Sequence, residues 1–157
     1  MKKQILTLFI LILLTGCSLG NTPTARVEDM LLKYQMLDNS INTSHVNLTS
    51  DPNLTTEQIN RYKELIKKQY KNLVYEIKEE EIDGKNATVT IQIEVINYKD
   101  IINNSNPNNH EDVLTALEKN KEKTTYTLDI TLIKDNDDNW QVEPLTKENY
   151  NKLLGIY

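Results

Sequence analysis

Cys17 is the only cysteine in a chain of 157 residues. It follows a cationic start at Lys2 and Lys3, a short apolar run over residues 5–14, and two small residues. A single cysteine cannot form a disulfide within the chain, so the fold must rest on its apolar core alone. With this length, we expect one domain with one core.

The residues Leu14-Thr15-Gly16-Cys17 resemble the lipobox of bacterial lipoproteins. In that family the thiol receives a diacylglyceryl group, and the peptide is cut just before the cysteine. The resemblance implies a signal peptide at 1–16 and a mature chain of 141 residues (157 − 16), lipid-anchored on the extracytoplasmic face of the cell membrane. Two acyl chains make such an anchor effectively permanent. We expect a lipidated Cys17 with a tether to residue 24, and a single domain over 25–157.

Two other interpretations of the N-terminal segment are weaker. A transmembrane helix needs roughly 20 apolar residues, about twice the length of this run. An ordinary secretory signal has the same charged start and apolar core, but it gives the cysteine no role.

The mature chain is acidic. Removal of Lys2 and Lys3 leaves 16 basic residues (18 − 2) against 23 acidic ones, a net charge of −7. A nucleic-acid surface needs clustered Lys and Arg, so we expect no nucleic-acid partner. Only Arg26 and Arg61 are arginines, so bidentate clamps for phosphate or carboxylate are scarce.

The two histidines predict neither catalysis nor metal binding. His45 and His110 both lie in Asn-rich polar segments and are expected to be exposed. Metal sites need several His, Cys or carboxylate ligands at defined spacing, and the sequence has no such cluster. We therefore predict no metal and no cofactor.

Two acidic runs invite a functional interpretation. A calcium loop beginning at Asp135 would need Gly at its sixth position and Glu at its twelfth, but these are Trp140 and Thr146. Residues 135–139 are therefore expected to form a polar hairpin turn. The run Glu79-Glu80-Glu81 is interpreted as solvated surface that discourages pairing at a sheet edge.

The periodicity of the chain predicts an α+β order. Helical spacing predicts a helix over about 25–38, with an extension to 48 left open. A capping box at Thr55–Gln58 begins a second helix, and an alternating strand starts at Leu73. Asp83-Gly84 predicts a hairpin turn, and the return strand runs over about 85–98.

The second half of the chain continues the same pattern. We expect a loop over 103–109, a short helix over 111–119, a third strand over 123–134 and a short fourth strand containing Trp140 and Val142. Thr146 is expected to cap a C-terminal helix. The strand residues expected to face the helices are Ala87, Val89, Ile91, Ile93, Val95, Tyr126, Leu128, Ile130 and Leu132. The predicted architecture is an antiparallel sheet of about four strands, covered by helices on one face and solvated on the other.

This order resembles the nuclear transport factor 2-like (cystatin-like) superfamily, and in particular small lipoproteins of Gram-positive bacteria. The resemblance covers roughly residues 24–145. It is carried by topology and by three segments, Arg26-Val27-Glu28-Asp29-Met30-Leu31, the hairpin over 73–95, and Asp138-Asn139-Trp140-Gln141-Val142. It implies a curved sheet that wraps a helix and leaves a conical pocket, in a superfamily that contains both enzymes and binding modules.

The alternating pattern also bears on catalysis. An isomerase of this fold needs an acid in an apolar pocket, but Asp129 and Glu94 fall on the polar strand face, so we predict no catalytic residue. Four aromatic residues, Tyr34, Tyr70, Tyr126 and Trp140, are either core or the lining of a pocket for a peptide, small-molecule or protein ligand. We expect a membrane-anchored, non-enzymatic binding module. The alternatives are a small isomerase-like or hydratase-like pocket enzyme and an immunity or exclusion lipoprotein.

Overall fold

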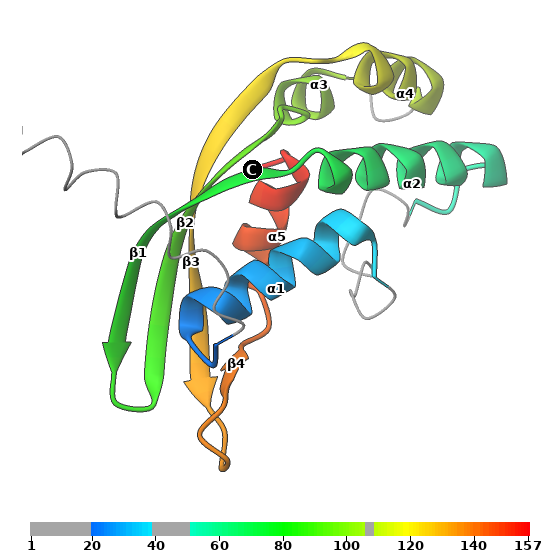
Figure 1. The fold of residues 1–157 in the computed structure, drawn as a ribbon. Helices are drawn as coiled ribbons and strands as arrows, with labels where there is room; N and C mark the ends of the chain where they lie inside the picture. The colour runs from blue at the N-terminus through cyan, green and yellow to red at the C-terminus, as the bar shows by residue number, and fades with distance from the viewer. Residues whose placement is uncertain (1–19, 39–50, 106–108) are drawn as a thin grey trace, which may run out of the picture.

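The computed structural model describes residues 20–38, 51–105 and 109–157. They form a curved, open sheet of four antiparallel strands in the order β1-β2-β3-β4, with helices packed against its inner face (Figure 1). The strands are β1 (Val74–Asp83), β2 (Asn86–Ile96), β3 (Lys123–Lys134) and β4 (Trp140–Val142). The helices are α1 (Pro23–Met36), α2 (Thr56–Lys71), α3 (Lys99–Asn104), α4 (His110–Lys119) and α5 (Lys147–Leu154). The predicted α+β fold class is confirmed.

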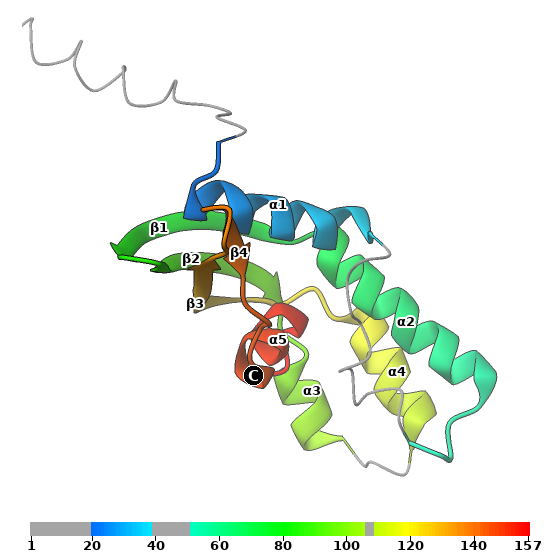
Figure 2. The same cartoon turned by 90° about the horizontal axis from the view of Figure 1, so that it is seen from below.

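Strand register places the apolar residues on one side of the sheet. Ile91 lies opposite Ile77 on β1 and opposite Leu128 on β3, and Ile91 and Leu128 are buried. Residues opposite one another across antiparallel strands share a face, so the alternating residues line up across the sheet. Helices α1 and α5 and the C-terminal half of α2 cover this inner face (Figure 2).

Local signals explain where the helices begin and end. Thr55 and Gln58 form the predicted capping box, with bonds of 3.0 and 3.2 Å between side chains and backbone N–H groups. Thr146 caps α5 through the backbone N–H of Asn149 at 3.1 Å. Helix α1 ends where Leu37 adopts a left-handed conformation, with φ of 55°. The possible extension to residue 48 lies largely in residues 39–50, outside the described part of the chain.

A second apolar cluster lies beyond the end of the sheet. Its buried members come from α2 and the turn before it, from α4, and from the end of β2 and the residues after it: Leu54, Tyr62, Leu65, Ile96, Tyr98, Val113, Leu114 and Leu117. Helix α3 packs against this cluster through Ile101 and Ile102. The sequence predicted a strand to residue 98 and a loop from 103, and this was wrong, because β2 ends at Ile96 and α3 forms over 99–104. Ile101 and Ile102 supply the apolar contact that an Asn-rich segment was not expected to provide.

Gln69 joins three elements in the interior. Its side-chain amide donates to the carbonyl oxygens of Ile96 at 2.8 Å and Leu154 at 3.0 Å, and its oxygen accepts from the backbone N–H of Ile96 at 3.0 Å. Gly155 lies against the same group with φ of +72°, and a Cβ there would meet the Ile96 carbonyl oxygen at 2.0 Å. Only glycine fits this approach of α5 to β2. We call Gln69, Ile96, Leu154 and Gly155 the Gln69 junction.

An irregularity in β1 changes which residues face inward. The register shifts between Ile77 and Glu79, so that Glu80 lies opposite the buried residue Val89. Glu80 is thereby turned toward α1, where its carboxylate accepts from the backbone N–H of Thr24 at 2.8 Å and from its hydroxyl at 2.6 Å. A carboxylate at a helix N-terminus is favourable, because the first backbone N–H groups lack partners within the helix.

Candidate functional site

A groove of about 380 Å³ lies between α1 and the segment formed by β4 and its connection to α5. We call it the α1 groove. On α1, Arg26, Met30 and Tyr34 follow at spacings of four residues, which places them along one side of the helix. The opposite wall consists of Trp140, Gln141, Val142, Glu143, Pro144, Leu145 and Tyr150. Asp29 and Lys33 of α1 also line it, so the groove combines polar and charged side chains with apolar and aromatic ones.

Two aromatic side chains at this groove are almost fully buried. Tyr34 and Trp140 are each 4% exposed, and the ring of Tyr34 packs edge-on against Tyr70 with centroids 5.0 Å apart. Burial raises the pKa of the Tyr34 hydroxyl, and its hydrogen bond with Tyr150 adds to this effect. Tyr34 therefore stays neutral at physiological pH. Its hydroxyl is a fixed hydrogen-bonding group rather than a base.

Arg26 is the distinctive charged residue of the groove. Its Nε atom is buried and has no hydrogen-bond partner among the described residues. The neighbouring cation Lys33 is already paired with Asp29 at 2.7 Å. A buried donor without a partner costs about 1–3 kcal/mol, and among the described residues the Tyr98 hydroxyl is the other side-chain group in this state. A planar guanidinium in this state can bind a carboxylate or another anionic group.

The sequence did not single out Arg26 as a site residue. In the sequence, Arg26 differs from most other residues only in being one of two arginines. The available signal was its position, four and eight residues before Met30 and Tyr34, which places a cation at one end of an apolar helix stripe. The partner wall comes from residues more than 100 positions later, and periodicity carries no information about that pairing.

The four predicted pocket residues have different surroundings in the described part of the structure. Tyr34 and Trp140 both line the α1 groove. Tyr70 is 2% exposed and lies against Tyr34 as part of the core. Tyr126 packs edge-on against Tyr157, and its hydroxyl donates to the Tyr157 carbonyl oxygen at 3.0 Å.

The two candidate catalytic acids occupy the outer side of the sheet. Asp129 is exposed, and its carboxylate accepts from the Thr90 hydroxyl at 2.8 Å. Glu94 forms an ion pair with Lys123 at 2.5 Å. Neither side chain lines the α1 groove, so neither lies in the apolar pocket that the acid of an isomerase-like site needs.

His110 was predicted to be exposed, and this was wrong, because its side chain packs against neighbouring residues. His45, the other predicted exposed histidine, lies outside the described residues. His110 is the first residue of α4, and its side chain is 18% exposed. Its Nε2 lies 3.2 Å from a carboxylate oxygen of Asp51, and its ring packs edge-on against Tyr62. A backbone N–H of Asn53 is the main cause of the lowered pKa of Asp51, and His110 adds to it. Within residues 20–38, 51–105 and 109–157, no three His, Cys, Asp or Glu side chains are grouped to hold a metal ion.

The two acidic runs have structural partners. Asp135 accepts from the backbone N–H groups of Asp137 and Asn139, both at 2.9 Å, which closes the hairpin turn and lowers the Asp135 pKa. In the run over 79–81, the side chains are exposed, and Glu80 contacts Thr24 as described above.

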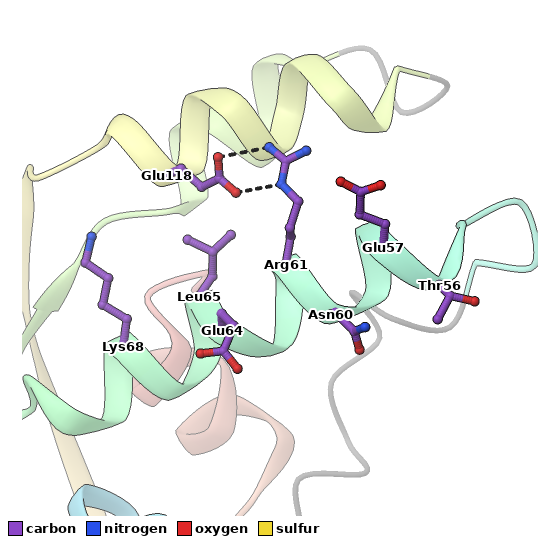
Figure 3. Close-up of a pocket in the computed structure, with 8 residues that line it drawn as sticks. All are labelled: Thr56, Glu57, Asn60, Arg61, Glu64, Leu65, Lys68 and Glu118. Atoms are coloured by element: carbon purple, nitrogen blue, oxygen red, sulfur yellow. Dashed lines mark hydrogen bonds and ion pairs between the residues drawn. The ribbon is translucent and has the colours of Figure 1, made fainter.

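A second and wider cleft of about 690 Å³ lies along the outer side of α2 (Figure 3). We call it the α2–α4 cleft. In it Arg61 binds Glu118 of α4 through two bonds of 2.7 and 2.9 Å, and it also contacts Glu111 at 2.6 Å. The hydrogen bonds from Arg61 lower the pKa of the Glu118 carboxyl. Arg61 thus pairs with two carboxylates and fastens α2 to α4, whereas the Nε of Arg26 in the α1 groove has no partner among the described residues.

The N-terminal segment matches a known family model. Residues 1–18 fit the model described as the prokaryotic membrane lipoprotein lipid attachment site. The chain is a membrane-anchored lipoprotein. Cys17, the predicted acceptor of the lipid, falls inside the matched segment but outside the residues that the structure describes.

The domain that follows the lipid attachment site matches no known protein in the other comparisons. No curated protein and no solved structure matches the chain, and the predicted membership of the nuclear transport factor 2-like superfamily has no support from a family model or from a structural match. Within the described parts of the chain, none of the helices has both the length and the apolar character needed to cross a membrane.

Proposed function

We propose that the domain of this lipoprotein is a non-enzymatic binding module on the extracytoplasmic face of the membrane. In this proposal the α1 groove holds a ligand that combines an apolar or aromatic part with a carboxylate. The buried Nε of Arg26, without a partner in the described residues, is the observation that carries the proposal. A peptide with a free C-terminal carboxylate and an apolar last residue has this chemistry, and so does a small aromatic acid.

The groove has apolar side chains in one part and the cation Arg26 in another, and this arrangement supports a ligand with an apolar part and a carboxylate. Apolar ligand atoms would lie over the partly exposed apolar side chains of the groove, Met30, Val142 and Leu145, where burial contributes about 25 cal/mol per Å². The anionic end would accept hydrogen bonds from Arg26, and such charge-assisted bonds contribute about 1.5–3 kcal/mol. The non-enzymatic part of the proposal draws on the outer-face positions of Asp129 and Glu94.

Trp140 provides the measurement. It is the only tryptophan of the chain and lines the groove, so its fluorescence reports on occupancy. We would titrate the lipoprotein with short peptides that end in an aromatic residue, each as the free acid and as the C-terminal amide, together with indole-3-acetate. We expect the acids to shift the fluorescence and raise the melting temperature, because a ligand that binds only the folded state stabilises it.

Arg26→Met is the decisive variant, because it keeps an apolar stem and removes every donor. We expect it to weaken binding of the acids by about 10-fold to 100-fold, from the loss of about 1.5–3 kcal/mol. Arg61→Met removes the other arginine, which lies in the α2–α4 cleft, and is expected to leave binding unchanged. Equal affinity for acids and amides, or unaltered binding by Arg26→Met, would refute the proposed ligand class.

A further inference from the structure

We infer that the domain stands on the membrane in one orientation, with its two hairpin tips toward the bilayer and the α2–α4 cleft directed away from it. The hairpin tips are the β1–β2 turn, residues 82–85, and the β3–β4 turn, residues 135–139. Their partner is the headgroup surface of the bilayer that holds the lipid of Cys17. This inference rests on the lipid attachment site and on the hydrogen bonds of the first described residues, and it does not depend on the proposed ligand.

Chain length limits where the lipid can lie. Cys17 is three peptide steps before Gly20 and four before Asn21. Consecutive Cα atoms are about 3.8 Å apart, so the Cα of Cys17 is within about 15 Å of the Cα of Asn21. The bilayer surface must therefore lie close to the place where Asn21 is bound.

Asn21 is bound to the tip of the second hairpin. Its side-chain amide donates to the Asp138 carbonyl oxygen at 2.8 Å, and its side-chain oxygen accepts from the Trp140 backbone N–H at 2.9 Å. Three residues later, Thr24 donates twice to Glu80, which lies near the end of β1. The start of the domain is thus fastened to both hairpins on the side of their turns, and the lipid is confined to that side.

The rest of the fold extends away from this point. In Figure 1 the N-terminal end of α2 and the whole of α4 lie at the opposite end of the molecule from the two turns, and Figure 2 shows the same separation. Helix α2 has 16 residues and is about 24 Å long. The tether is too short to carry Cys17 past the sheet to the outer end of this helix.

The composition of the tips suits contact with headgroups without insertion. Ile82 is 55% exposed at the first turn and offers one apolar side chain. The two turns carry four aspartates, Asp83, Asp135, Asp137 and Asp138, against one cation, Lys85, and anionic lipids repel this net negative charge. Because attraction between the tips and the lipid is weak, the hydrogen bonds of Asn21 and Thr24 must set the orientation.

Energy transfer to the bilayer tests the orientation. The lipidated full chain would be reconstituted in phosphatidylcholine vesicles that carry an acceptor dye on a fraction of the headgroups. Because Cys17 is acylated, a single introduced cysteine is the only thiol that a donor dye can label. We expect Lys85→Cys and Asn136→Cys at the tips to show severalfold more efficient transfer than Glu57→Cys and Asn60→Cys on α2. Equal transfer at the four positions, or stronger transfer from α2, would overturn the inference.

A matched pair of double variants tests the cause. Asn21→Ala with Glu80→Ala removes both sets of hydrogen bonds, and we expect the difference between tip and α2 positions to shrink. Glu79→Ala with Glu81→Ala removes two charges from the same strand but leaves those bonds, and the difference should persist. If the first variant keeps the full difference, the bonds do not set the orientation. The Trp140 titration in the same vesicles reports ligand binding separately, so failure of either proposal is recognised independently.

Discussion

Replacing Gln69 by leucine tests the interior hydrogen bonds of the domain most directly. Gln69 is 1% exposed and bonds to two carbonyl oxygens and one backbone N–H. Leucine has a similar size but no polar atoms, so Gln69→Leu leaves three backbone groups of Ile96 and Leu154 without this partner. We expect a large loss of stability from a substitution that makes the core more apolar.

The magnitude follows from those three groups. Each buried backbone group that loses its partner costs about 1–3 kcal/mol, which gives about 3–9 kcal/mol for an additive sum. Burial of the leucine side chain returns about 1.5–3 kcal/mol. Relaxation of the surrounding backbone recovers part of the remainder, and we expect a net loss of about 3 kcal/mol. With a urea m-value of about 2 kcal/mol/M, the unfolding midpoint should fall by about 1.5 M.

The assay is urea unfolding of the domain followed by circular dichroism. Gln92→Leu is the matched control, because it makes the same chemical change on the outer face of β2, where substitutions cost about 0.5 kcal/mol or less. Our reasoning would be refuted if the two variants had the same midpoint, or if Gln69→Leu were as stable as the unchanged protein.

Three further outcomes are expected. Cys17→Ala should abolish labelling of the protein by a fatty-acid analogue, and label that persists in this variant would contradict the lipid site. Ile91→Asp should unfold the domain by placing an unpaired carboxylate in the core, whereas Thr90→Asp on the outer face should cost far less, and similar urea midpoints would contradict the strand register. The pKa of Glu118 is lowered by Arg61, so its contribution to stability is present above the unfolded pKa and is lost as the pH falls through the folded one. Glu118→Gln should therefore lose less stability than the unchanged protein between about pH 5 and pH 3 in urea melts at each pH.

Local patterns were sufficient to predict most of the secondary structure. Thr55 and Thr146 begin helices as expected, because a capping side chain and its backbone partner are three residues apart in the chain. The inward set on β2 followed from alternation, since a shift of one residue would expose every apolar side chain. Short-range rules of this kind need no knowledge of the tertiary structure.

The features that could not be predicted from the sequence depend on contacts between residues far apart in the chain. Gln69 occurs in a helix that also carries Lys67 and Lys68, and only its contacts with Ile96 and Leu154 show that it is interior. Glu80 shares a sheet face with Val89 because of the irregularity in β1, and nothing in the sequence of that strand predicts the irregularity. The α1 groove likewise needs both walls, and its second wall lies more than 100 residues after Arg26.

The Gln69 junction also has a consequence for the time at which this domain can fold. Its members range from Gln69 to Gly155, and 86 residues (155 − 69) separate them. At a synthesis rate of about 5–20 residues per second, Gly155 is added about 4–17 s after Gln69. Until then α1 and α2 are the only helices made so far that can cover the inner face of the sheet, and the part that Leu153 and Leu154 of α5 cover stays exposed. The inner face of this domain therefore cannot be completed before residues 147–155 have been made, and the chain stays incompletely folded until then, which suits a protein that crosses the membrane before it folds.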